Sequence, residues 1–301
     1  MMNEIKEFLK KYNIHPLYYK KYKSVVVVKD KNNTYAIKKR SNNSRNLYKY
    51  LRSRSFNYYP EVLNESSDDN YDIFKFYEDF SVPKEERAED LIGMTSMLHV
   101  KTTHYENTTL DDYKKEYEKL AKELDNLSDF YNDLNNLIDE EIYMSPSEYL
   151  LVRNISKIYS AINFCSNELD EWYDEIKDKT RKRVVLNNNN LELDHLIKGD
   201  RSTLISWDKA YYSSPIYDLY NFYKKEYKNV DFEYLLDLYE KRYPLSDDEK
   251  RLLFILISIP EKVSFQNDEF VSVRNVNDVL DYVYKTEKII SKYYSDTKND
   301  E

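Results

Sequence analysis

The residues of this chain that could do chemistry lie mainly between residues 184 and 220. A polar loop there holds three consecutive asparagines, Asn188–Asn190, and His195 follows soon after. Asp208 comes two positions after Ser206, so the two side chains would share one face of a strand. An imidazole and carboxylates brought together could hold a cation, with a preference for zinc or another transition metal over magnesium. Alternatively, Asp208 and His195 are ordinary loop residues.

Two further acids, Glu192 and Asp194, lie in the same loop and could join Asp208 and His195 around a cation. The spacing is not that of a zinc motif such as H-E-x-x-H. A G-x-S-x-G nucleophile motif is also absent from the sequence. The chain contains only 2 glycines, which excludes the glycine-rich phosphate loops G-x-G-x-x-G and G-x-x-x-x-G-K-[ST].

The order of these residues resembles the catalytic segment of the aminoglycoside phosphotransferase/choline kinase superfamily, in particular its bacterial spore-coat branch. Those relatives carry a strand, H-G-D-L-x-x-x-N, a short hairpin, I-D-W-E, and later a Tyr-Asp-Leu that opens a helix. Asn188, Asn189 and Asn190 stand where the family has His, Gly and Asp. His195 stands where it has a metal-binding Asn, and Ser206 replaces the metal-binding Asp.

Other positions keep the family pattern. Trp207 and Asp208 match the W-E pair, and we expect Trp207 to pack between two lobes. Asp218 lies in the Tyr-Asp-Leu stretch, where the resemblance implies a structural aspartate that accepts backbone N–H bonds from the catalytic loop. Lys38 ends an Ala-Ile-Lys triplet like the one that supplies a lysine to the nucleotide phosphates. The resemblance therefore implies ATP and magnesium as ligands, bound weakly if at all. We expect His99 to be a packing residue.

Phosphoryl transfer requires divalent cations between the phosphates, a lysine on them, and a carboxylate that orients and deprotonates the acceptor. Asn190 cannot accept a proton near neutral pH, and loss of a general base typically costs about 10²–10⁴ in rate. Ser206 offers a neutral hydroxyl where magnesium prefers anionic oxygens. Residues 43–55, where the resemblance places a glutamate for Lys38, contain no acid.

These losses predict a catalytically inactive pseudokinase that acts as a binding or assembly module. Two alternatives remain open at this point. One is an active ATP-dependent small-molecule phosphotransferase with relocated metal ligands. The other is a purely structural protein whose cleft is filled by its own aromatic side chains, since the chain has 32 tyrosines.

The hydrophobic pattern predicts an α+β fold, and the resemblance implies that it is a bilobal, protein-kinase-like one. A small β-rich lobe is expected over residues 1–80, and a large helical lobe with the catalytic-loop-like segment over 84–301. In the small lobe we expect strands at 22–28, 34–40, 59–63 and 71–77 and a helix at 43–55. In the large lobe we expect helices at 110–141, 147–178, 214–226, 231–242, 246–259 and 276–294.

The distribution of charge is uneven. From Lys20 to Arg54 there are twelve basic residues against one acid, whereas the whole chain carries −9. This segment is either a solvated face that pairs with the acidic remainder, or a site for phosphate or for an acidic protein partner. The net negative charge argues against general nucleic-acid binding.

Composition also bears on location. The sequence has no apolar run of 18 residues, so we expect no membrane span, and its start lacks the apolar stretch of a secretory signal. The single cysteine, Cys165, cannot form an internal disulfide. We therefore expect a cytoplasmic protein.

Overall fold

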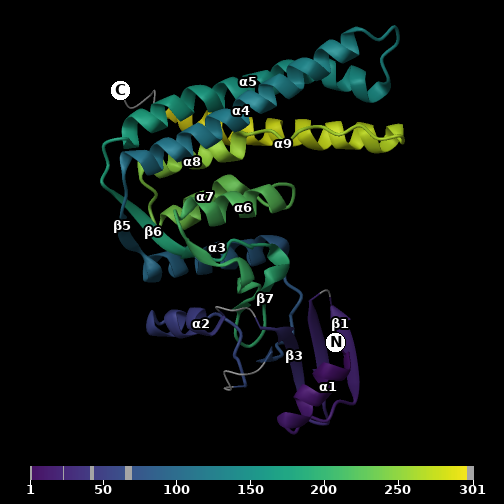
Figure 1. Cartoon of the computed structure of the whole chain (residues 1–301), viewed down its shortest axis with the longest axis vertical. Helices are drawn as coiled ribbons and strands as arrows, with labels where there is room; N and C mark the ends of the chain where they lie inside the picture. Colours follow the sequence, from purple (N-terminus) through teal and green to yellow (C-terminus); the bar gives the residue numbers. More distant parts are fainter. Residues whose placement is uncertain (1, 23, 41–43, 65–69, 297–301) are drawn as a thin grey trace.

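The structure of the chain is a computed structural model that describes residues 2–22, 24–40, 44–64 and 70–296. Lys23 of the basic segment and parts of the expected lobes, 41–43, 65–69 and 297–301, lie outside the described residues. The architecture is α+β, as predicted, with a small sheet lobe and a large helical lobe. Figure 1 shows the sheet lobe at one end of the molecule with the N-terminus, and the long α4–α5 hairpin at the other end.

The sheet lobe is an antiparallel four-stranded sheet in which neighbours in the chain are neighbours in space. Its strands are β1 (Tyr18–Tyr22), β2 (Val25–Lys29), β3 (Thr34–Lys39) and β4 (Tyr71–Lys75). Helix α1 (Met2–Lys11) packs on one face, where Ile5 and Leu9 meet Val26 and Val28 in a small core. The predicted single strand at 22–28 is wrong at its start, because the chain turns between Tyr22 and Val25.

The segment between α2 (Ser44–Ser53) and β4 corrects a second prediction. Residues 59–63 form no strand, and only an isolated bridge joins Val62 to Phe74. Pro60 lacks the N–H that a ladder needs, and Tyr59 is buried against the core instead. The segment therefore passes beneath α2 and connects this helix to the edge of the sheet.

The helical lobe is built from seven helices in the described part of the chain. They are α3 (Lys84–Thr102), α4 (Leu110–Asp139), α5 (Pro146–Ile176), α6 (Ile216–Glu226), α7 (Phe232–Glu240), α8 (Asp247–Ser258) and α9 (Glu269–Asp296). Helices α4, α5, α8 and α9 pack on one another as one layer, and α6 and α7 lie between this layer and α3. Reciprocal capping boxes at Thr109 and Ser145 start α4 and α5, which satisfies their first N–H groups. Among the described helices, none combines the length and apolar character that a membrane crossing requires.

The segment with the candidate chemistry emerges from a second, three-stranded sheet. Strand β6 (Arg181–Asn187) pairs with β5 (His104–Asn107) on one side and β9 (Tyr211–Ser213) on the other. Its buried residues Val184, Val185 and Leu186 anchor it in the large core. The polar loop follows directly, and then a short hairpin of β7 (Leu196–Ile197) and β8 (Thr203–Leu204) leads toward the sheet lobe.

Candidate functional site

The polar loop after β6 is held from below by a buried chain of polar groups. Asp218, in the first turn of α6, accepts the backbone N–H groups of Asn188 at 2.9 Å and Asn189 at 2.6 Å. His99 Nε2 lies 3.2 Å from the same carboxylate, and His99 Nδ1 lies 2.6 Å from the Tyr239 hydroxyl. The side chains of Asp218 and His99 are both 0% exposed. Helices α3, α6 and α7 thus fix the loop by contacts distant in sequence.

The loop also depends on a residue in the left-handed region. Asn189 has φ 55°, at the position where the resemblance places glycine. Asparagine adopts this conformation more readily than other non-glycine residues. Ser206, at the position of the metal-binding aspartate, has φ 64° and ψ 46°. A serine held there costs free energy, of order 1–3 kcal/mol, so the surrounding structure must impose this conformation.

At the position where the resemblance places the catalytic base, the structure has an amide next to an ammonium group. Lys225 Nζ, on α6, donates to Asn190 Oδ1 at 3.0 Å and also pairs with Glu192. The Asn190 N–H donates to Asn188 Oδ1 at 3.1 Å, so the first and third asparagines brace each other. The sequence did not reveal Lys225, which lies 35 residues further along the chain. Asn190 is therefore a neutral amide that lies beside the ion pair of Lys225 with Glu192.

Both ring nitrogens of His195 face other residues of the same loop. Its Nδ1 lies 2.6 Å from the Asn190 carbonyl oxygen, and because a carbonyl only accepts, Nδ1 carries the proton of this bond. Its Nε2 lies 3.8 Å from Glu192 Oε2. Over the described ranges, no group of three or more His, Cys, Asp or Glu side chains could hold a metal ion. The hypothetical grouping of Asp208, His195 and Asp194 is thus not assembled in this structure.

The lysine expected at the phosphates is bonded to an aspartate of the other lobe. Lys38 Nζ, on β3, donates to Asp208 Oδ2 from the turn after β8. The two side chains are 22% and 47% exposed. The ammonium has three N–H donors, so a nucleotide phosphate that contacts it would either share it with Asp208 or displace this aspartate.

The resemblance would place a glutamate on the helix and pair it with Lys38. In the structure the acid is on the sheet and the cation is on the helix. Asp72, across from Lys38 in the sheet register, is buried and accepts from Arg40 Nε at 2.7 Å. Arg45 of α2 approaches the same Asp72 oxygen at 4.0 Å. Helix α2 therefore contributes a cation, and the sheet supplies the acid. This pairing was not visible in the sequence, because it joins residues 27 positions apart.

Trp207 lies in the core rather than at the surface of the site. It is 5% exposed, and its Nε1 donates to the Leu204 carbonyl at 2.6 Å. Its ring meets Phe56, which follows α2, edge-on at 6.0 Å. This contact joins the segment after α2 to the β7–β8 hairpin.

The residues present do not fit magnesium. The two positions that the resemblance assigns to metal ligands are the Ser206 hydroxyl and the His195 imidazole, and neither supplies the anionic oxygen that Mg²⁺ prefers. Asp208 is the carboxylate nearest to Ser206 in sequence, and it is already bonded to Lys38. This arrangement therefore does not support phosphoryl transfer through a bound magnesium ion.

Comparisons with known proteins define the fold. No protein-family model matches the sequence, and no curated protein matches it. A solved aminoglycoside phosphotransferase from Alicyclobacillus acidocaldarius superposes with a TM-score of 0.71 at 10% identity, covering 97% of this chain and 95% of that one. A spectinomycin phosphotransferase in complex with AMP gives 0.53 at 12% identity, covering 96% and 94%. A putative aminoglycoside phosphotransferase from Ralstonia eutropha gives 0.52 at 10% identity, covering 95% and 98%.

These similarities confirm the predicted fold. The chain has the bilobal, protein-kinase-like fold of these solved phosphotransferases, and the likeness covers nearly the whole chain. At these sequence identities the likeness concerns the fold alone and does not extend to the chemistry of the site.

Proposed function

We propose that this chain is a kinase-like binding module that has lost phosphoryl transfer. The observation that carries the proposal is the contact of Asn190 with Lys225 at 3.0 Å. An amide oxygen that accepts a hydrogen bond from an ammonium group cannot take the proton of an acceptor alcohol near neutral pH. Loss of the base alone would cost about 10²–10⁴ in rate.

The phosphate-binding groups support the same proposal. Ser206 stands in place of a metal-binding carboxylate, and Lys38 is engaged by Asp208. ATP and magnesium are therefore not required partners of this module. A nucleotide phosphate at Lys38 meets a charge that Asp208 already neutralises, which lowers its affinity.

The binding role is assigned to the basic segment from Lys20 to Arg54, which offers cations to an acidic protein partner. The likeness of the 184–220 segment to the spore-coat branch favours a role in a bacterial assembly. The single cysteine, Cys165, is buried and favours a cytoplasmic setting. With a net charge of −9, we expect no general nucleic-acid binding, and we expect no membrane partner.

A phosphoryl-transfer assay tests the proposal. The full chain is incubated with labelled ATP, with Mg²⁺, Mn²⁺ or Zn²⁺, and with a panel of hydroxylated and amino acceptors. We expect turnover equal to that of Asn190→Ala, because residue 190 contributes no base in either protein. Turnover by the natural chain that Asn190→Ala lowers by tenfold or more would overturn the proposal.

The bond between Lys38 and Asp208 favours one second candidate, an active phosphotransferase with relocated ligands. This bond places a carboxylate beside the phosphate lysine, two residues from the family's metal-binding position. The candidate requires ATP turnover that Asp208→Ala abolishes while Asp194→Ala leaves it intact. Turnover that is indifferent to Asp208→Ala would dispose of it.

A further inference from the structure

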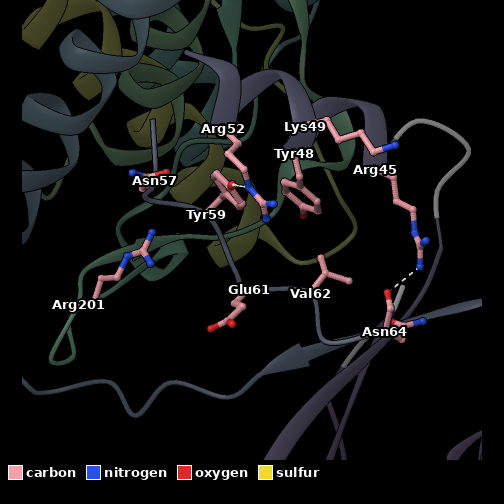
Figure 2. Close-up of a pocket in the computed structure, with 10 residues that line it drawn as sticks. All are labelled: Arg45, Tyr48, Lys49, Arg52, Asn57, Tyr59, Glu61, Val62, Asn64 and Arg201. Atoms are coloured by element: carbon pink, nitrogen blue, oxygen red, sulfur yellow. Dashed lines mark hydrogen bonds between the residues drawn. The ribbon is translucent and has the colours of Figure 1, made fainter. Parts of the chain in front are cut away.

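A basic cavity lies beneath helix α2, apart from the site described above. It has a volume of about 560 Å³ and opens between α2, residues 57–64 and the turn of the β7–β8 hairpin (Figure 2). We call it the α2 pocket. Its lining contains none of the cleft residues Lys38, Asn190, Ser206 or Asp208. Whatever it binds, it binds independently of the proposed loss of catalysis.

The lining of the α2 pocket is strongly cationic. Arg45, Lys49 and Arg52 come from α2, and Arg201 comes from the opposite side, from the hairpin turn. Among the described lining residues, Glu61 is the sole carboxylate. Concentrated positive charge around a concave space attracts anions.

Three of these cations are also available to a ligand. Within the described part of the chain, Lys49, Arg52 and Arg201 form no ion pair with a carboxylate. Arg52 Nε donates to the Tyr59 hydroxyl at 3.4 Å, a long contact that orients the guanidinium without neutralising it. All three side chains belong to exposed residues. A ligand could therefore engage them without first breaking an ion pair to any described carboxylate.

The wall below these cations is aromatic and apolar. Tyr48 and Tyr59 stack with ring centroids 5.1 Å apart and an angle of 17° between the planes, and Val62 lies beside them. A volume of this size is typical of small-molecule sites, which are about 300–1,000 Å³. The shape thus suits a compact molecule, and the guanidinium groups suit phosphate, which they bind through paired N–H donors.

We propose that the α2 pocket binds a compact organic polyanion that carries at least two phosphate groups. Arg52 engages one end of the ligand from α2, and Arg201 engages the other from the hairpin turn. Because α2 lies between β3 and β4 of the sheet lobe and Arg201 belongs to the helical lobe, the ligand bridges the two lobes.

Isothermal titration of the full chain with tripolyphosphate in metal-free buffer tests this proposal. We expect one site per chain and an affinity at least tenfold higher than that for inorganic phosphate. Arg52→Gln and Arg201→Gln should each weaken binding about tenfold, because each removes a charged hydrogen-bond donor. Arg54→Gln is the matched control: it makes the same charge change two residues from Arg52, does not line the pocket, and should leave the affinity unchanged within twofold.

The outcomes separate this proposal from its competitors. Absence of tripolyphosphate binding would overturn the proposal. A loss of affinity in Arg54→Gln equal to that in Arg52→Gln would also overturn it, because it would indicate only nonspecific attraction to a basic surface. Tighter binding of an aspartate-rich decapeptide than of tripolyphosphate would overturn it in favour of an acidic protein partner. Lys38→Met should leave tripolyphosphate binding intact, whereas a loss there would place the ligand between Lys38 and Asp208 instead. Thermal unfolding of each variant checks that the fold is unchanged.

Discussion

Two groups of contacts differ in burial and in chemistry. One is the set of hydrogen bonds that Asp218 makes below the polar loop, and the other is the ion pair of Lys38 with Asp208. Asp218, His99 and Tyr239 are fully buried and satisfy one another and the loop backbone. Lys38 and Asp208 are partly exposed and satisfy only each other among the contacts described. The difference teaches that buried groups hold the backbone of this loop in shape. Under the proposed function, the groups that would act on a substrate are replaced or engaged elsewhere.

The largest expected effect follows from removing the buried carboxylate. Asp218→Ala leaves the N–H groups of Asn188 and Asn189 without an acceptor in a dry environment. We expect a loss of about 3 kcal/mol or more in the free energy of unfolding. Urea denaturation measures it, with Asp208→Ala as the control of the same chemical change. Equal losses for both variants would remove the distinction between the two regions.

Tyr239 gives a pH-dependent test of the buried region. Loss of its hydroxyl in Tyr239→Phe should cost about 1 kcal/mol at pH 7, because the contact with His99 Nδ1 disappears. Burial raises the pKa of Tyr239 well above its usual value in the folded protein. The unfolded chain therefore loses this proton first, so above about pH 10 the stability of the natural protein should fall relative to Tyr239→Phe, by up to about 1.4 kcal/mol per pH unit.

Urea denaturation of both proteins between pH 7 and 11 checks this expectation. Tyr284→Phe, which removes a hydroxyl from a residue that is 67% exposed, is the control for the other effects of alkaline pH. A constant difference between the natural protein and Tyr239→Phe across this range would show that the hydroxyl is accessible to water in the folded state.

The smallest effect is expected from the exposed pair. Asp208→Asn and Lys38→Met should each change the free energy of unfolding by less than about 1 kcal/mol, because both charges remain accessible to water. The double variant should equal the sum of the single variants within about 0.5 kcal/mol. A coupling energy above 2 kcal/mol in the double-mutant cycle would mean that this pair holds the lobes together and belongs to the structural support.

Much of the fold was predictable from local patterns. The long helices α4 and α5 follow from sustained 3.6-residue periodicity, and Ser145 with Pro146 marks the start of α5. Strand β1 was missed because most of its side chains are exposed and show no alternation, and β5 because it is short and polar. The 59–63 strand was predicted wrongly, since apolar residues there pack beneath α2 rather than in a sheet.

The candidate site was predictable only in outline. The family-like order of residues pointed to the loop at Asn188–Asn190 and to Asp218, which the structure brings into contact. The partners Lys225 and Tyr239, and the pairing of Arg45 with Asp72, were missed. Such contacts depend on how distant elements pack, and a single sequence carries no local signal for them.

The most direct test of the central claim is a titration with Mn²⁺, a spectroscopic substitute for Mg²⁺, in the presence of a non-hydrolysable ATP analogue. Electron paramagnetic resonance counts the ions that the protein holds beyond those bound by the nucleotide alone. We predict none for the natural chain, and at least one for Asn190→Asp combined with Ser206→Asp, which restores two carboxylates. Protein-dependent Mn²⁺ in the natural chain that disappears in Asp208→Asn would contradict the account and identify Asp208 as a working metal ligand.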